Sequence, residues 1–367
     1  FYYQCGTHAY MGGTVTIVEP YEGRTVHVYT RGSASDQWSL FDTLSGLGGP
    51  NSKNAVGTCV SVSGTRILTT GVSNTIMGDS AEYAYNWTLT DVVPGITLKD
   101  VVTTTNDPSE TRMDISISGD GLRMVIGNES EGDGTLRVYE KVPGSIGEYS
   151  WGTTTQLTLS VTGVKIGSDV CMNGNGTILA CVGNQTSGSS KIYVSTFNST
   201  WSALTEITGS TPFEGVGNIH VSSGGLFLVC SGVNPTGTGE QHSYVRVLSG
   251  AYGIGGLSWV YRDGQDNGSD SAGYLSVDSS TGQAHHALGI SDDGSRTFFV
   301  SNGQAYVYSY NGTRYVEEQQ ITTSYHETYG VNGCMNGNGD LLVMRASYSD
   351  YEVWERLGSG TTWTLTQ

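Results

Sequence analysis

The sequence predicts an all-β protein, a seven-bladed β-propeller whose blades are four-stranded antiparallel sheets. Two observations predict it: a composition rich in turn formers and poor in charge, and a block of sequence that recurs at the spacing of a propeller blade. Glycine supplies 53 of 367 residues, while charged residues make up only 14%. Turn-rich β proteins have this composition, and the 22 tyrosines exclude a disordered chain, which would lack aromatic residues.

The first repeated feature is an aromatic residue that opens a short, threonine-rich segment. Its positions give intervals of 48 to 64 residues, which is the length of a propeller blade. The segments open at Trp38, Trp87, Trp151, Trp201, Trp259, Tyr315 and Trp363.

The second repeated feature is an alternating run, a polar turn with glycine, and another apolar run. Period-two alternation on both sides of Asn-Gly or Asp-Gly predicts a β-hairpin, because such turns need φ > 0 at their centre. These hairpins begin at Cys59, Ile115, Val170, Ile219, Leu288 and Gly333. A third, β-branched and aromatic strand follows in each unit, at Val26, Glu82, Leu136, Lys191, Tyr244, Ala305 and Tyr351.

Each unit therefore supplies four strands, and we expect one propeller domain over residues 1–367. In the first blade the opening strand would be Phe1 to Cys5, with a long turn before Thr14. Six or eight blades remain alternatives if an end of the chain pairs with another segment. A sandwich gives no reason for an aromatic in phase seven times, and a β-helix has a shorter repeat. The expected blades are 1–46, 47–100, 101–159, 160–209, 210–263, 264–322 and 323–367.

The charge balance and hydropathy exclude several classes of partner. The net charge of −17 would repel nucleic acid and anionic lipid. No stretch approaches the length of a transmembrane helix, so no membrane span is expected. Because the chain begins at Phe1, we expect a processed protein or a fragment of a longer one.

The repeated units resemble the FG-GAP-type repeats of integrin α-subunit heads and of many secreted propellers. The pattern is S-x-D-G, an apolar run ending in Gly, then G-x-V-x-V-Y, and its best copy starts at Ser118. In the integrin repeats this turn carries calcium ligands, whereas the equivalent positions here offer at most one carboxylate. We therefore expect no cofactor, with calcium as the alternative. The equivalent positions are Cys171, Asn173, Asn175, Cys334, Asn336, Asn338 and Asp340.

The cysteines and histidines offer no recognisable metal or redox motif. The cysteines Cys59, Cys171 and Cys334 share one place in the repeat, as do Cys181 and Cys230, which favours buried free thiols over disulfides. A hairpin centred on 174–175 would pair Cys171 with Ile178 and keep it from bonding Cys181. The adjacent histidines at 285 and 286 would point to opposite faces of a strand, so they do not suit one metal.

Acidic residues in the longest loops carry the only enzyme hypothesis. Paired carboxylates perform glycoside hydrolysis, and loops at one face of a propeller bring such groups together. Exposed acids in an acidic chain are more often simply solvated. The candidate cation or sugar ligands are Glu129, Glu131, Asp133, Asp263, Asp266 and Asp270.

Seven N-x-[ST] sequons make N-glycosylation a second prediction. Asn86, Asn198 and Asn311 fall in the expected turn between the third and fourth strands, and Asn128 and Asn184 each end a second strand. All are expected to be exposed, although asparagine also suits tight turns for its own sake. The acceptors are Asn86, Asn128, Asn175, Asn184, Asn198, Asn267 and Asn311.

Together these features favour a non-enzymatic, extracellular or cell-surface structural or adhesive module. Its expected partners are proteins or further copies of itself in a surface assembly, and possible glycans. The alternative is a secreted carbohydrate-binding propeller, either a lectin or a glycosidase that uses the acidic loops. A third interpretation, an intracellular scaffold of the kelch type, fits free thiols but not occupied sequons.

Overall fold

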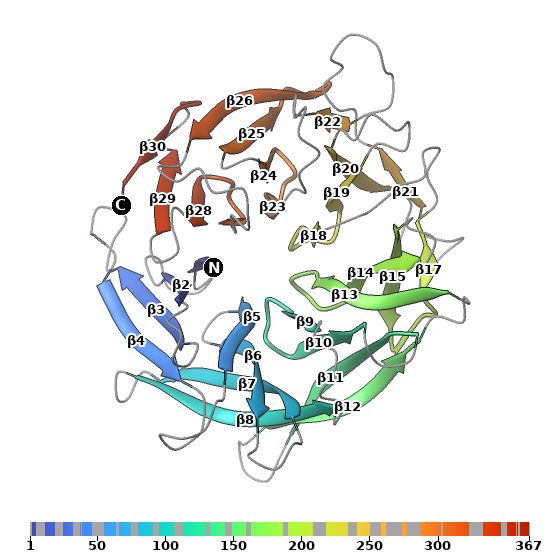
Figure 1. The fold of residues 1–367 in the computed structure, drawn as a ribbon. Helices are drawn as coiled ribbons and strands as arrows, with labels where there is room; N and C mark the ends of the chain where they lie inside the picture. Colours follow the sequence, from blue (N-terminus) through green and yellow to red (C-terminus); the bar gives the residue numbers. More distant parts are fainter. Residues whose placement is uncertain are drawn as a thin grey trace. The chain divides into compact units, whose positions relative to one another are not determined.

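A computed structural model of the chain contains β-strands and turns in the residues that it describes (Figure 1). No helix in that part of the chain is long and apolar enough to cross a membrane. The described residues are 2–4, 12–18, 25–31, 37, 39–45, 55–63, 66–74, 80–90, 95–105, 113–129, 133–143, 149–158, 163–185, 190–207, 218–233, 241–249, 258–261, 274–276, 287–301, 304–322, 333–345, 351–356, 358 and 360–366.

The strands form antiparallel sheets in which neighbours in sequence are also neighbours in the sheet. Each sheet takes four successive strands, as the repeated units predict. The first three sheets consist of β1 Tyr2–Gln4, β2 Gly12–Val18, β3 Thr25–Arg31 and β4 Ser39–Ser45; β5 Ala55–Ser63, β6 Arg66–Asn74, β7 Ser80–Thr90 and β8 Gly95–Thr105; and β9 Met113–Ile117, β10 Arg123–Asn128, β11 Thr135–Pro143 and β12 Tyr149–Leu157.

The later sheets repeat this order, and two of them add a short fifth strand. The extra strands are β17, which pairs with β15, and β22, which pairs with β20. The sheets consist of β13 Val164–Met172, β14 Ile178–Gln185, β15 Ser190–Asn198, β16 Thr200–Trp201 and β17 Thr205–Glu206; β18 Ile219–Val221, β19 Phe227–Val233, β20 Gln241–Ser249, β21 Ser258–Tyr261 and β22 Tyr274–Ser276; β23 Ala287–Ile290, β24 Arg296–Ser301, β25 Gln304–Tyr310 and β26 Tyr315–Thr322; and β27 Gly333–Met335, β28 Leu341–Arg345, β29 Tyr351–Arg356 and β30 Trp363–Leu365.

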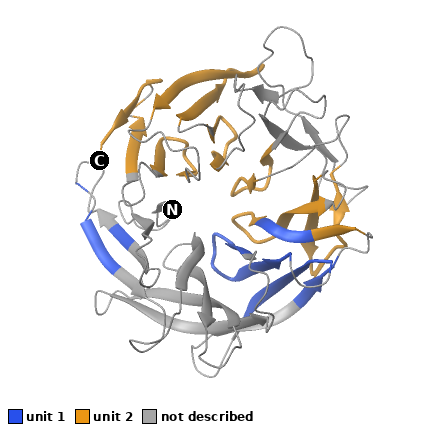
Figure 2. Ribbon diagram, viewed as in Figure 1, with its two compact units in different colours: residues 1–160, 166–170 blue, residues 161–165, 171–367 orange. Residues whose placement is uncertain are grey.

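This architecture confirms the all-β prediction and is consistent with a β-propeller. The chain divides into two compact units, residues 1–160 with 166–170, and residues 161–165 with 171–367 (Figure 2). Within each unit the first strands of successive sheets lie side by side: β5 contacts β9 in the first, and β23 contacts both β18 and β27 in the second.

The five described turns between the first and second strands of a sheet, those after β9, β13, β18, β23 and β27, share one construction. A serine or asparagine oxygen accepts the backbone N–H at the far side of the turn, as Ser118 Oγ does from Arg123 at 3.0 Å and Asn173 Oδ1 does from Ile178 at 2.8 Å. In these five turns the third residue after the capping residue is a glycine in the left-handed region, where a side chain would be strained. These glycines are Gly121, Gly176, Gly225, Gly294 and Gly339.

Apolar side chains fill the space between successive sheets of the second unit. One cluster joins Ile178 and Val182 of β14 to Leu228 of β19, and another joins Phe298 of β24 to Leu342 of β28. Because side chains alternate across a strand, both faces of a middle sheet are buried in this way. The sheets are therefore held to one another by side-chain burial, which is the dominant favourable term in folding.

The structure differs from the expected strand boundaries in two places. Strand β8 continues to Thr105, beyond the expected blade boundary at 100, and β22 pairs with β20 although it follows the boundary at 263. The hairpin after β13 is centred one residue later than expected, so the residue opposite Ile178 changes by two positions, because the Asn173 N–H donates to Ile178 O at 3.0 Å. The expected pairing of Cys171 with Ile178 is therefore wrong, and the asparagine cap is the physical reason.

The predicted free thiols are confirmed where the structure describes them. Cys171, Cys181 and Cys230 are buried and unbonded to other cysteines, and Cys334 is half-buried. As predicted, Cys171 and Cys334 lie on first strands and Cys181 and Cys230 on second strands. The side chains of Cys5 and Cys59 lie outside the described residues.

Gly134 is the glycine whose replacement tests packing in the first unit. Its φ is +87°, and an added Cβ would lie 2.1 Å from the Ile166 carbonyl oxygen. We expect Gly134→Ala to lower the free energy of unfolding by about 1–3 kcal/mol more than Gly312→Ala does, because backbone overlap adds to the conformational strain. Gly312 is the matched control, since its φ is +97° and no atom lies within 4 Å of the added Cβ. Equal midpoints for the two variants in urea denaturation would contradict this packing.

Candidate functional site

The turns of the second unit are joined to one another by a row of hydrogen bonds. In two turns the residue after the cap donates its backbone N–H to a carbonyl of the next turn: Gly174 to Ser223 O at 2.7 Å, and Asp292 to Gly337 O at 2.7 Å. Between these two links, the Ser223 N–H donates instead to the carboxylate oxygen Oδ1 of Asp292 at 3.0 Å. We call Gly174, Ser223, Asp292 and Gly337 the turn row.

The Asp292 carboxylate occupies space that a glycine leaves open. A Cβ added to Gly337 would lie 2.4 Å from Oδ2 of Asp292, so any larger residue at 337 would displace the carboxylate. Asp292 is nevertheless exposed to solvent as a whole. In the turn row, the Asp292 carboxylate thus accepts one of the hydrogen bonds between turns, and backbone carbonyl groups accept the other two.

His220 lies at the centre of β18, three residues before Ser223 of the turn row. Its neighbours Ile219 and Val221 are 6% and 3% exposed, whereas His220 itself is half-buried. Burial lowers the pKa of the His220 imidazole below its ordinary 6.5, and the negative charge of Asp292 raises it in part. At neutral pH the ring is therefore uncharged, with one nitrogen able to accept a proton.

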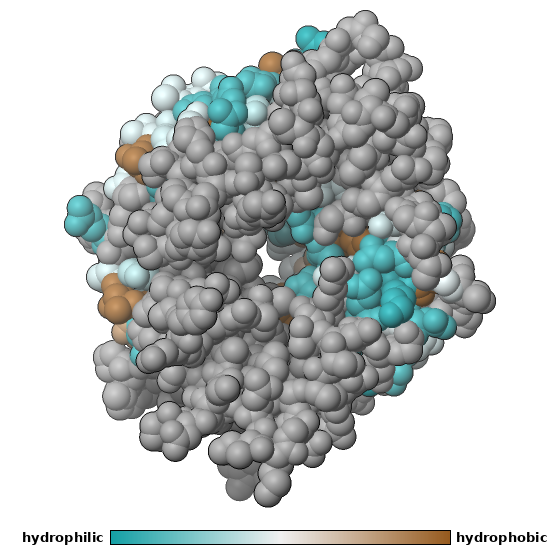
Figure 3. Space-filling model, viewed as in Figure 1, coloured by the Kyte–Doolittle hydropathy of each residue, from teal (hydrophilic) through white to brown (hydrophobic). Residues whose placement is uncertain are grey.

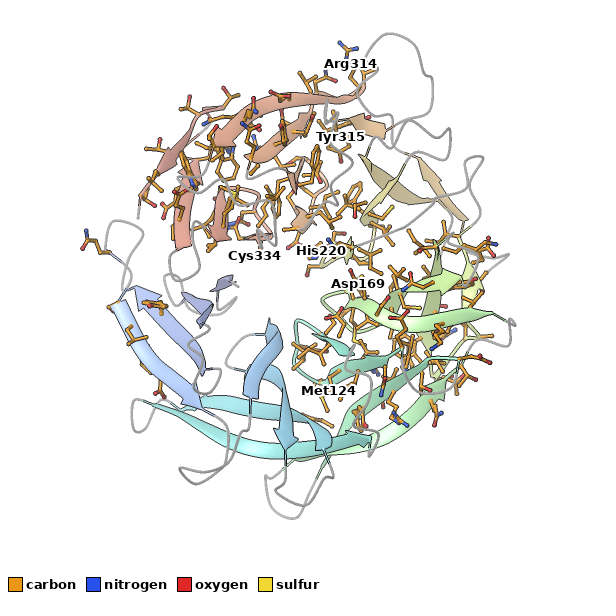
Figure 4. All side chains as sticks on the ribbon, in the orientation of Figure 1. Met124, Asp169, His220, Arg314, Tyr315 and Cys334 are labelled. Carbon is orange, nitrogen blue, oxygen red and sulfur yellow. The ribbon has the colours of Figure 1, made fainter. Side chains whose placement is uncertain are left out.

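Figure 4 places His220 on β18 and Cys334 on β27, both on first strands of their sheets. Both residues stand two positions before the cap of their turn, and the same position holds Cys171 on β13 and Gly289 on β23. His220 is thus the ionisable base at this position of the second unit. On the face seen in Figure 3, the described side chains near β14 and β18 are mostly hydrophilic.

Two aspartates of the first unit lie four residues before the cap of their turn. They are Asp114 on β9 and Asp169 on β13. Asp114 Oδ2 accepts the Val170 N–H at 2.7 Å, and Oδ1 accepts the Ile115 N–H at 2.8 Å. Oδ2 thus links β9 to β13, while Oδ1 bonds within β9, and both contacts are structural. Within the described residues, no group of three His, Cys, Asp or Glu side chains is arranged to hold a metal ion.

The acidic loop residues predicted as ligands are only partly described. Glu129 is half-buried at the end of β10, and Asp133 is exposed, with its carbonyl oxygen accepting the Ile166 N–H at 3.2 Å. The remaining candidates, Glu131, Asp263, Asp266 and Asp270, lie outside the described residues. The structure therefore does not bring this set together in the part that it describes.

The sequons differ in exposure, which corrects the expectation that all are accessible. Asn128 is 2% exposed, because it ends β10 where Gly167 approaches its backbone. Asn86 lies inside β7 rather than in a turn, opposite Leu68 of β6, because β7 continues to Thr90. Asn267 is not among the described residues.

The other four sequons lie at strand ends or in turns. Asn198 and Asn311 are exposed, at the end of β15 and directly after β25. Asn175 is exposed, but its Oδ1 accepts hydrogen bonds at 2.6 Å from Asn173 and from Thr177 within its own turn. Asn184 is half-buried and accepts the Ser190 hydroxyl at 2.9 Å.

Sequence reasoning missed both His220 and Asp292. A signal was present: aligned on the caps, the turns have Gly119, Gly174, Ser223 and Gly337 where this turn has Asp292. Such an exception to a repeat at a fixed backbone position indicates a special role. Nothing local to the sequence, however, places this carboxylate beside a histidine in another hairpin.

The calcium turns of the FG-GAP comparison have a different use here. Asn173 Oδ1 accepts the Thr177 and Ile178 N–H groups, both at 2.8 Å, and Asn336 Oδ1 likewise accepts from Asp340 and Leu341. The side-chain oxygens at these positions therefore accept hydrogen bonds from the backbone of their own turn. The S-x-D-G pattern is explained in the same way, since Asp120 Oδ1 accepts the Leu122 N–H at 2.9 Å.

Comparisons with known proteins place the fold. No protein-family description matches the chain, and no curated protein matches its sequence. Solved structures do match. The periplasmic gluconolactonase of Pseudomonas aeruginosa has a TM-score of 0.62 at 12% identity, covering 97% of this chain and 95% of that chain. The chain shares its fold.

Two further structures agree. They are putative 6-phosphogluconolactonases of Bacteroides uniformis and Bacteroides fragilis, each with a TM-score of 0.60 at 14% identity. The matches cover 96% and 97% of this chain and 95% and 94% of theirs. At such identities the likeness concerns the fold.

These neighbours correct the function expected from the sequence. The resemblance to FG-GAP repeats is wrong, since these three proteins, which share the fold over almost the whole chain, are named as a gluconolactonase and putative 6-phosphogluconolactonases. The expectation of a structural or adhesive module without enzymatic activity is wrong for the same reason. Short turn motifs misled the comparison because hairpins of this shape require the same residues in unrelated proteins.

Exposure predicts which sequons accept a glycan. When the chain passes through a eukaryotic secretory pathway, we expect glycans at Asn198 and Asn311 and none at Asn128, because acceptors must be reachable at the surface. Mass spectrometry of glycopeptides measures each site, with Asn311→Gln as the control for assignment. A glycan on Asn128 would contradict its burial at the end of β10.

Proposed function

We propose that the protein is a hydrolase of lactone esters and that His220 is its general base. The observation that carries this proposal is a half-buried histidine, uncharged at neutral pH, on a first strand whose following turn donates a hydrogen bond to the Asp292 carboxylate. The named activities of the gluconolactonases that share the fold support it.

Hydrolysis of a lactone requires a general base to activate water. A neutral imidazole takes a proton from water as the water oxygen attacks the lactone carbonyl, and the ring C–O bond then breaks with return of the proton to the leaving oxygen. The product is a hydroxy acid whose carboxyl group ionises at neutral pH. One water molecule is consumed and one proton is released for each lactone opened.

The charge of the chain favours a neutral sugar lactone over a phosphorylated one. The net charge is −17, and the first strands β9, β18, β23 and β27 carry no lysine or arginine in the residues described. A phosphate dianion would approach against the field of the protein. We therefore propose a substrate of the gluconolactone class.

We further propose that the sheets close into a single seven-bladed propeller over residues 1–367. The repeated four-stranded sheets and the contacts between their first strands support this arrangement. An extracellular or periplasmic location is proposed from the periplasmic neighbour and the sequons. Self-association, protein partners and the absence of a cofactor stay predictions.

The test is hydrolysis of glucono-δ-lactone, followed by proton release at constant pH and corrected for spontaneous opening. We expect His220→Gln to lower kcat/KM by about 10²- to 10⁴-fold, the usual contribution of a general base. For the wild-type protein, kcat/KM falls as the pH is lowered through the pKa of His220. Because burial lowers that pKa, the acid limb lies below pH 6.5.

His242 gives a matched control, because it is also a strand histidine but lies on β20. We expect His242→Gln to leave kcat/KM within about twofold of the wild type, because it changes no residue of β18 or of the turn row. Unchanged hydrolysis in His220→Gln would assign the base elsewhere. A wild-type protein without activity on either the plain or the phosphorylated lactone would overturn the proposal.

A further inference from the structure

We propose that Asp292 is a positioning residue for His220, fixing the histidine strand against the neighbouring sheet and holding a negative charge beside the imidazole. This inference rests on the proposed function, because it assigns to Asp292 the control of the position and pKa of the proposed base, His220. Asp292 itself touches no reacting atom in this account and acts through His220.

The first argument is the hydrogen bond that ties the two hairpins together. The Ser223 N–H, in the turn that follows His220, donates to Asp292 Oδ1 at 3.0 Å. The backbone N–H of Asp292 is itself held by Gly337 O at 2.7 Å. The carboxylate is thus anchored from both sides, once through its own backbone and once through the turn of β18 and β19.

The second argument is the packing beneath this bond. His220 lies opposite Val229 in the β18–β19 pairing, and Val229 belongs to a buried cluster with Leu288 and Ile290 of β23. Ile290 is two residues before Asp292. The face of the sheet that carries His220 is therefore the face packed against the strand that leads into Asp292.

The third argument is that only this carboxylate of the turn points out of its own hairpin. The next residue, Asp293, uses Oδ1 within the turn, where it accepts the Ser291 hydroxyl at 2.7 Å and the Ser295 N–H at 2.8 Å. Asp292 instead reaches across to another sheet, over the open space at Gly337. Two adjacent aspartates therefore have different roles.

The other ionisable groups around β18 do not provide the same charge. In the described elements packed against it and the turn that follows β23, these are Cys181 on β14, Cys230 on β19, Asp293 in the turn and Arg296 at the start of β24. Cys230 lies opposite Ile219, on the other face from His220. Arg296 is paired with Glu318 at 2.9 Å.

The functional consequence follows from two opposing effects on the imidazole. Burial lowers the pKa of His220, and Asp292 raises it. A base whose pKa falls far below the working pH accepts a proton less readily in the transition state. Burial therefore keeps His220 uncharged at neutral pH, while the Asp292 charge keeps it basic enough to act.

The experiment compares Asp292→Asn with Asp293→Asn. Both remove one negative charge from adjacent positions, and asparagine at 292 keeps an oxygen that can accept the Ser223 N–H. The pKa of His220 is measured by NMR titration of its ring protons, assigned with His220→Gln, and kcat/KM for glucono-δ-lactone is measured over pH. We expect Asp292→Asn to lower the His220 pKa, move the acid limb to lower pH and reduce the plateau rate severalfold. Asp293→Asn leaves all three unchanged.

Gly337→Ala provides a second variant that keeps the charge. Its Cβ would lie 2.4 Å from Oδ2, so the carboxylate must shift, and we expect a change in the His220 pKa of the same direction but smaller. This variant tests the inference even if Asp292→Asn does not fold. An unchanged His220 pKa in both Asp292→Asn and Gly337→Ala would overturn the inference.

The titration and the kinetics separate the two proposals. If the pKa of His220 responds to Asp292 but no lactone is hydrolysed, the coupling holds and the proposed function fails. If His220→Gln abolishes hydrolysis but Asp292→Asn changes neither the pKa nor the rate, the function holds and the positioning role fails.

Discussion

The five sheets that begin with β9, β13, β18, β23 and β27 depend on one local constraint, the turn in which a side-chain oxygen and a left-handed glycine reverse the chain between the first and second strands. The cap oxygen of Ser118, Asn173 or Ser291 accepts a backbone N–H that the turn would otherwise leave unbonded. A buried N–H without a partner is costly, so this bond and the glycine together fix the hairpin register. Register in turn decides which side chains reach the next sheet, because a slip of one residue moves every side chain to the other face.

The same turns also connect the sheets of the second unit. Where backbone carbonyls accept the linking bond at Ser223 and Gly337, a side-chain carboxylate accepts it at Asp292. A carbonyl and a carboxylate satisfy the N–H equally well, but only the carboxylate adds a charge. Replacing one backbone link by a side chain thus gives the row an electrostatic effect without loss of its structural bond.

The surroundings of His220 suit a base for a neutral substrate. Its partial burial disfavours the imidazolium, and the charge at Asp292 limits that effect. An acidic chain with no lysine or arginine on four of the described first strands offers a phosphate group no favourable contact. The proposed sugar-lactone substrate would need only a base and hydrogen-bonding groups from the protein.

The sequence determined the strand pattern, because alternation and turn residues act within ten residues or so. It predicted the hairpins, the third strands and the shared places of Cys171 and Cys334. Strand ends such as Thr105 of β8 were missed, since pairing partners rather than propensity set them. The tertiary structure alone decided that Asn128 is buried beside Gly167 and that Asp292 bonds the turn after His220. Those contacts join residues far apart in the chain, and which faces meet across two sheets depends on register and packing that no local pattern encodes.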